Sequence, residues 1–179
     1  QLWALWNEGC WVGGLDGRAG GRRAAGGLVD TRHAQKGSGE EKNCAVLGIL
    51  QVQEGITMGT GAALFGNLVY KEALSDKVNP VLDDQLTVYD SVQKVLSAAI
   101  TNMASTAATS SPPAAADLVY AGDLGSWTAL AHTLKAMFYL HTAAGSPGAF
   151  AQARAGAQQG ITAAAGNYFR ALPHQRAHT

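Results

Sequence analysis

Five histidines are the side chains in this sequence best suited to metal or acid–base chemistry, and their spacing argues against both. They are His33, His132, His141, His174 and His178. His132 and His141 fall on one predicted helix, nine residues apart, which puts them on opposite faces at about 100° per residue. Neither has a cysteine or carboxylate three or four residues away to complete a ligand pair. The sequence therefore predicts no metal site, and we expect His141 to lie at the edge of the core.

Paired carboxylates are the basis of glycoside hydrolysis, and two pairs occur here. Asp83 and Asp84 are adjacent in a predicted loop, and Asp117 and Asp123 bracket a short apolar turn. Loop aspartates more often cap helices and form turns. The glycines around Gly59 do not follow a strand, and neither a P-loop nor a nucleophile elbow is found. We therefore expect a protein that is not an enzyme and that needs no cofactor.

The composition of the chain also limits the classes of binding partner to be expected. The 179 residues suffice for one ordinary domain, and the formal net charge is zero with only 15% charged residues. This balance gives no electrostatic reason to expect nucleic acid as a partner. No run approaches the roughly 18 apolar residues of a membrane-spanning helix. Cys10 and Cys44 are the two cysteines, and their positions in the sequence cannot show whether they pair.

Apolar periodicity predicts four helices. Their expected spans are 45–65, 84–103 with Asp84 or Thr87 as N-cap, 126–143 with Ser126 as N-cap, and 149–165. Glycines 55, 59 and 61 predict a kink or a close helix contact in the first. The last helix is expected to turn inward Phe150, Ala153, Ala157, Ile161 and Ala164. The fold class is thus mainly α, with antiparallel helix pairs in a tetratricopeptide-like stack.

The two ends differ from this helical region, which we assign to residues 43–168. Residues 1–42 are rich in glycine, arginine and polar side chains, and we expect them to be irregular, disordered or foreign. An arginine–glycine RNA-binding tail is the alternative, but aromatic residues for base stacking are absent between Arg18 and Cys44. Residues 169–179 are expected to form an irregular tail. We hypothesise that both ends are frameshifted or otherwise foreign.

Three ordered motifs between Cys44 and Tyr168 resemble the SusD/RagB family. The stretch LFGNLVYKEAL at 64–74 is similar to a helix that ends at a Phe-Gly turn before a "PYSEAL" segment. The stretch 79–103 resembles the loop and helix that follow it. The most specific match is DLVYAGDLGSWTALAHTLKAMFYLHTA at 117–143, which resembles "D..Y.GD...W...ANSLKAR.YL". His132, Thr133 and Met137 depart from that pattern.

The resemblance implies a lipid-anchored protein on the outer face of the Gram-negative outer membrane. Such proteins bind an oligosaccharide or polysaccharide and pass it to a TonB-dependent, SusC-like transporter. Their tetratricopeptide-like helices form a scaffold, and irregular segments build most of the sugar site. The chain has neither an initiator methionine nor a signal peptide, so we expect an internal fragment of such a protein. A helical protein–protein interaction module without ligand binding is the alternative function.

Three residues are candidates for contact with a sugar. Trp127 has the ring face that suits a pyranose, but its phase with Leu130 and Leu134 favours a place in the core. Asn67 and Tyr70 follow a helix in a predicted loop, where we expect them to be exposed.

Overall fold

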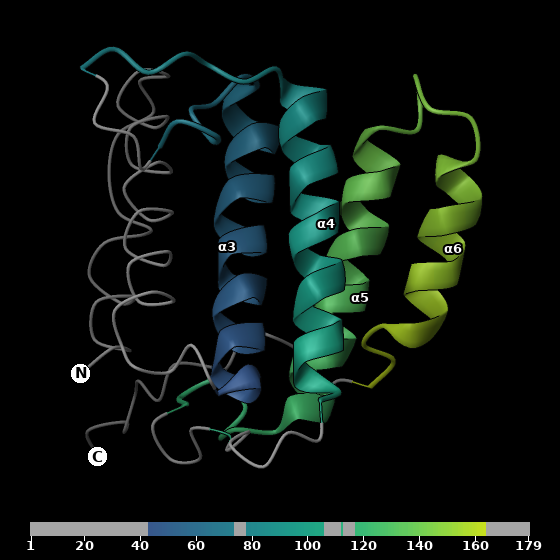
Figure 1. Ribbon diagram of the computed structural model, residues 1–179. Coiled ribbons are helices and arrows are strands. Elements are labelled where there is room, and N and C mark those ends of the chain that lie inside the picture. The colour runs from purple at the N-terminus through teal and green to yellow at the C-terminus, as the bar shows by residue number, and fades with distance from the viewer. Residues whose placement is uncertain (1–42, 74–77, 106–111, 113–116, 164–179) are drawn as a thin grey trace, which may run out of the picture.

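The computed structural model describes residues 43–73, 78–105, 112 and 117–163. These residues form four helices, which are α3 (Cys44–Phe65), α4 (Gln85–Met103), α5 (Leu124–His141) and α6 (Ala149–Gln159). The helices run alternately up and down, so that α3 pairs with α4 and α5 with α6 (Figure 1). Apart from one antiparallel bridge between Leu68 and Asp83, the described residues contain no β structure. The prediction of a mainly helical fold with antiparallel pairs is confirmed. The predictions for residues 1–42 and 169–179 fall outside the described residues, and so does Cys10, so whether Cys10 and Cys44 pair stays open.

Helix α3 is the longest and most deeply buried helix of the described region. Its N-cap is Asn43, whose side chain accepts a hydrogen bond from the Val46 N–H at 3.3 Å. It ends at Gly66, where a φ of 74° lies in the left-handed region that glycine adopts without strain. Between these ends α3 is buried on most sides, with twelve of its 22 residues in the interior. This burial explains why apolar residues occur around most of the circumference of α3 and not along one stripe.

Glycine brings the other helices close to α3. A Cβ at Gly55 would approach the Leu96 side chain on α4, and one at Gly59 would approach the Phe138 ring on α5, both well under 3.0 Å. Only a hydrogen atom fits at these positions. The sequence left a kink and a close helix contact as alternatives, and the structure shows the close contact.

Helix α4 follows its predicted pattern. Asp84, rather than Thr87, is the N-cap, and its carboxylate accepts from the Leu86 N–H at 3.0 Å. One stripe of the helix is buried, and it consists of Val88, Tyr89, Val92, Leu96, Ala99 and Met103. The three- and four-residue spacing of this stripe is what the sequence predicted.

Helix α5 begins three residues earlier than predicted, with its N-cap at position 123 rather than 126. Its N-cap is Asp123, because that carboxylate accepts from the backbone N–H groups of Gly125 and Ser126. The expectation that Ser126 caps the helix was wrong, since its hydroxyl donates to Asp123 instead. The Ser126 bonds lower the pKa of Asp123, so the cap carries a negative charge at the positive end of the helix.

Helix α6 is shorter than predicted and presents a different face. It ends at Gln159, because Gly160 is extended and the Ile161 N–H turns to the Thr133 hydroxyl on α5 at 2.9 Å. Ala149 and Ala153 form its buried side. Phe150 is 69% exposed and Ala157 is also exposed, so their predicted inward orientation was wrong. Ile161 does pack against the core, and Ala164 lies outside the described residues.

The core is one cluster shared by α3, α4, α5 and the loop after α3. Its largest fully buried side chains are Trp127, Phe138, Ile49, Met58, Leu68 and Leu96. Helix α6 contacts α5 far more than any other helix and so lies at the edge of the stack (Figure 1).

Candidate functional site

A buried carboxylate organises the turn that precedes α5. Asp117 is 2% exposed and accepts hydrogen bonds from the backbone N–H groups of Val119, Tyr120 and Gly122 at 2.8 to 3.2 Å. Its Oδ2 also accepts from the Trp127 indole N–H at 2.6 Å. Four donors on one carboxylate compensate its removal from water. The first aspartate of the D..Y.GD...W pattern therefore binds the turn to the core.

The backbone conformation of this turn directs those N–H groups toward Asp117. Ala121 and Gly122 have φ values of 52° and 83°, in the left-handed region. The Tyr120 ring meets Trp127 edge to face, with centroids 5.2 Å apart. Burial, together with the nearby charge of Asp117, raises the pKa of Tyr120 to about 12.

Trp127, the first of the predicted sugar contacts, is fully buried. Its ring packs against Tyr120 and its N–H is taken by Asp117, as described above. The interpretation of Trp127 as a core residue at the start of the helix is confirmed. Any contact between its ring and a sugar would need the surrounding side chains to move.

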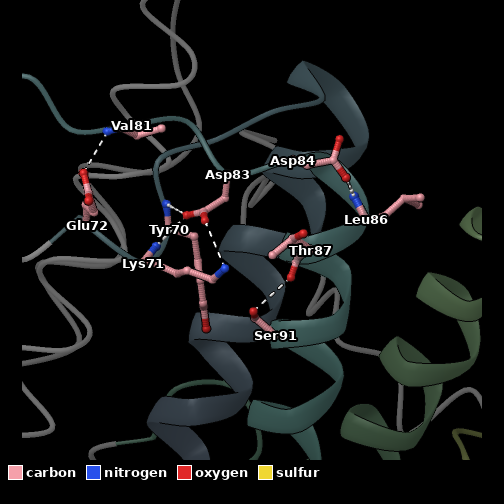
Figure 2. A network of polar contacts seen from close by, with 9 residues as sticks. All are labelled: Tyr70, Lys71, Glu72, Val81, Asp83, Asp84, Leu86, Thr87 and Ser91. Carbon is pink, nitrogen blue, oxygen red and sulfur yellow. Dashed lines mark hydrogen bonds and ion pairs between the residues drawn. The ribbon is translucent and has the colours of Figure 1, made fainter.

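A second carboxylate organises the loop between α3 and α4. Asp83 accepts from the backbone N–H groups of Tyr70 at 3.1 Å and Lys71 at 2.7 Å, and it pairs with the Lys71 ammonium at 3.5 Å (Figure 2). Partial burial would raise the pKa of Asp83, but these hydrogen bonds and the Lys71 charge lower it. Glu72 adds a further tie by accepting from the Val81 N–H at 2.9 Å. The carboxylates of Asp83 and Glu72 thus join the two sides of the loop.

Tyr70 and Asn67 lie in this loop. The loop is at the opposite end of the stack from the start of α5, the helix that contains Trp127 (Figure 1). Tyr70 is only 5% exposed, and its hydroxyl donates to Glu54 on α3 at 2.8 Å. The expectation that Tyr70 is exposed was wrong, because its phenol completes the hydrogen bonding of a buried carboxylate. Asn67 is exposed as expected, and its Oδ1 accepts from the Gln85 N–H at 3.1 Å. The structure therefore brings two of the three candidates into one loop and leaves the third apart.

Polar side chains join α4 to α5 outside the core. The Lys135 ammonium donates to the Ser97 hydroxyl at 2.5 Å, and the Gln93 amide donates to the Lys135 carbonyl at 3.0 Å. Burial lowers the pKa of Lys135, and burial and the Lys135 charge lower that of His132. His141 is exposed, but its Nδ1 lies 3.0 Å from the Tyr89 hydroxyl and its ring packs on Phe138.

An open cavity of about 580 Å³ lies between α4, α5 and α6, and His132 is one of the residues that line it. Its walls are mainly apolar, and His132, Thr128 and Gln159 supply its polar atoms. Across the described ranges, no three His, Cys, Asp or Glu side chains gather closely enough to hold a metal ion. Within the same ranges, no helix has the length and hydropathy needed to cross a membrane.

Two residues that organise these loops were not assigned their roles from the sequence. The hydrogen bond of Glu54 could not be predicted from the sequence, because its partner Tyr70 is sixteen residues away on another element. The bond of Asp117 could have been predicted, because the ten-residue spacing to Trp127 lies within the quoted motif.

The comparisons with known proteins agree with this architecture. Residues 27–167 match the model of the SusD-like family, described as the SusD and RagB outer membrane lipoproteins. This match covers more than half of the chain, so the chain belongs to the SusD-like family. No curated protein matches it significantly.

Three solved structures share the fold. A SusD-like protein from Bacteroides thetaiotaomicron VPI-5482 matches with a TM-score of 0.64 at 21% identity, over 81% of this chain and 30% of its own length. A chitin-binding protein matches with a TM-score of 0.67 at 24% identity, over 89% and 35%. A SusD homologue from Bacteroides uniformis ATCC 8492 gives 0.59 at 23% identity, over 80% and 28%. The chain thus spans about a third of the length of the structures that it matches.

Proposed function

We propose that the protein represented by this chain binds oligosaccharides or polysaccharides at the outer face of the outer membrane. It is held there by a lipid anchor and passes the glycan to a TonB-dependent, SusC-like transporter. The observation that carries this proposal is the family match over residues 27–167. The fold shared with a chitin-binding protein supports a glycan as the ligand. The function is binding rather than catalysis.

Within that function, we assign this chain to the supporting scaffold. Its helices bury the rings of Trp127 and Tyr70, which are therefore not available as stacking platforms for a sugar. Asn67 is the exposed member of the three candidates, and its role as a sugar contact stays a prediction. Most of the sugar site then comes from segments of the longer protein that this chain does not include.

Isothermal titration with chitin oligosaccharides and a panel of other glycans tests this proposal. A family member of full length that contains this sequence should bind one of the glycans, and the 179-residue chain alone should bind weakly or not at all. Micromolar binding by the chain alone would contradict the assignment to the scaffold. Failure of the full-length protein to bind any glycan would contradict the proposed function itself.

A helical protein–protein interaction module is the second candidate function. The observation that favours it is the exposure of three aliphatic side chains on the α3–α4 loop, which are Val78, Val81 and Leu82. In the form given above, without ligand binding, this function excludes the first, so glycan titration of the full-length protein separates the two.

A further inference from the structure

Three polar side chains follow one another along α5 at helical spacing. They are Thr128, His132 and Lys135, separated by four and three residues. Side chains at this spacing are neighbours on one face of a helix, with Cβ atoms about 5–6 Å apart. Thr128 and His132 line the open cavity between α4, α5 and α6, and Lys135 lies one turn further along the same face. We call these three residues the polar stripe.

The ammonium of Lys135 is half-buried, and its hydrogen bonds go to neutral groups. It donates to the Ser97 hydroxyl at 2.5 Å and to the Gln93 carbonyl at 3.3 Å. No carboxylate of the described ranges lies within ion-pair distance of it. Because an ammonium has three N–H groups, one is left for a ligand. An anion beside Lys135 would also offset the cost of burying its charge.

The other two members of the polar stripe also have polar atoms to offer. In the part of the chain that the structure describes, neither the His132 ring nitrogens nor the Thr128 hydroxyl has a hydrogen-bond partner. On the α6 side of the cavity, Gln159 donates one amide N–H to the Ala155 carbonyl at 3.4 Å, and its amide oxygen can accept a bond. Several polar groups that can bind a ligand therefore line one cavity.

The remainder of the cavity wall is largely apolar, with Met103, Leu124 and Ala129 as its main contributors. The cavity volume of about 580 Å³ falls among those of small-molecule sites, roughly 300–1,000 Å³. A purely apolar ligand would cover the polar atoms without pairing them, which is costly. A neutral sugar would pair the hydroxyl and amide groups but would leave the Lys135 charge without a counter-charge. A sugar that carries a carboxylate satisfies both.

We propose that the polar stripe and the cavity beside it form a subsite for a uronic acid, a sugar residue that bears a carboxylate. This inference rests on the proposed function, which supplies a sugar as the ligand. The carboxylate lies between Lys135 and His132. The ring hydroxyls bond to Thr128 and Gln159, and the apolar face of the ring lies on the apolar wall. One charged contact near the surface is weak, so this subsite alone should bind with a Kd on the order of 1 mM.

Binding at this place should be linked to protonation of His132. Burial and the Lys135 charge lower the pKa of His132, so its ring is neutral near pH 7. The charged residues of the neighbouring helices α4 and α6 are Asp90, Lys94 and Arg154, and none of them lines the cavity. A bound carboxylate favours the protonated imidazole and so raises its pKa. By linkage, the carboxylate should bind more tightly as the pH falls.

Histidine NMR on the full-length protein tests the inference. Protein labelled with ¹³C at histidine Cε1 is titrated with D-glucuronate, and His132→Asn identifies the His132 signal. Glucuronate should move this signal to saturation, raise the pKa of His132, and bind about tenfold more tightly at about pH 5 than at about pH 8. D-Glucose, which lacks the carboxylate, and acetate, which lacks the ring, should each bind at least about tenfold more weakly.

Matched variants identify the group that recognises the carboxylate. Lys135→Met should weaken glucuronate binding at least about tenfold. Lys94→Met removes the same charge from the exposed side of α4 and should leave binding unchanged. Because Lys135 also joins α4 to α5, Thr128→Val provides a second variant that leaves this contact intact, and it should weaken binding about threefold.

The other possible results contradict the inference. A His132 signal that glucuronate does not shift, or an equal loss of affinity in Lys135→Met and Lys94→Met, would overturn the subsite. Equal binding of acetate would show a simple carboxylate site and overturn the role of the sugar. Binding that is independent of pH would remove the carboxylate from the neighbourhood of His132. Titration with chitin oligosaccharides tests the proposed function separately, because their binding without any response to glucuronate would overturn the subsite alone.

Discussion

Two turns at opposite ends of the stack are built by the same device. In each, one aspartate gathers backbone N–H groups that would otherwise be unsatisfied, Asp83 in the α3–α4 loop and Asp117 before α5. They differ in their last partner. Asp117 takes the N–H of the buried Trp127, whereas Asp83 takes the ammonium of Lys71, which is largely exposed.

This difference in partners determines how strongly each turn is expected to contribute to the stability of the fold. The Asp117 turn is tied to the core through Trp127, so its loss must disturb the interior. The Asp83 turn reaches the core through the backbone of Leu68 and Tyr70, and its remaining partner, Lys71, is largely exposed. We therefore expect the Asp117 turn to matter more for folding than the Asp83 turn.

The largest expected effect is that of Asp117→Asn. The amide removes the charge and replaces one acceptor oxygen by a donor, which leaves buried N–H groups unpaired. We expect a loss of at least about 3 kcal/mol in the free energy of unfolding. Urea unfolding of the chain measures it. A loss below about 1 kcal/mol would mean that the Asp117 turn is no more coupled to the core than an ordinary surface turn.

Trp127→Phe should have the next largest effect. It removes the indole donor to Asp117 Oδ2 and leaves a space in a fully buried site, so we expect about 2–3 kcal/mol of destabilisation. A double-mutant cycle with Asp117→Asn should show that the two effects are less than additive. Full additivity would show that the indole–carboxylate bond does not couple the turn to the core.

Asp83→Asn should cost much less, about 1 kcal/mol, because an amide oxygen can keep one backbone bond and the lost ion pair with Lys71 is largely exposed. The pKa of Asp83 is lowered from 3.8, so its charge stabilises the fold above that pH and the benefit is lost as pH falls through the folded pKa. The gap between wild type and variant should therefore narrow in acid. A cost equal to that of Asp117→Asn would remove the distinction between the turns.

The last effect appears only at high pH and concerns Tyr120. Its pKa rises from 10.0 to about 12 in the fold, so the neutral phenol is favoured there. Its contribution to stability is complete below pH 10 and is lost as pH rises toward 12. The stability of the wild type relative to Tyr120→Phe should therefore fall across this interval. A constant difference would show that neither burial nor the charge of Asp117 raises the pKa of Tyr120.

The sequence predicted the helices best where burial leaves a clear stripe. The periodicity of α4 identified all of Val92, Leu96 and Met103 as buried. The predicted inward face of α6 was wrong, because alanine fits a buried face and an exposed face equally well. Phe150 was predicted to point inward and is exposed. The start of α5 was misplaced because Asp123 and Ser126 are both good N-caps, and only geometry shows which one accepts the backbone bonds.

The sites were harder to predict than the fold. The burial of Tyr70 depends on Glu54, a partner on another helix that no local pattern reveals. Trp127 was placed correctly because its phase along α5 already pointed to the core. The exposed aliphatic residues from Val78 to Leu86 lie partly in a loop, where periodicity carries no information about burial.

The glycines of α3 determine how closely its two neighbours approach. Gly48 and Gly55 face α4, and Gly59 faces α5, and a Cβ at any of them would meet a side chain of the facing helix at less than 3.0 Å. A larger residue at one of these positions would therefore push one neighbour outward. The spacing of the helices could be redesigned in this way, one crossing at a time.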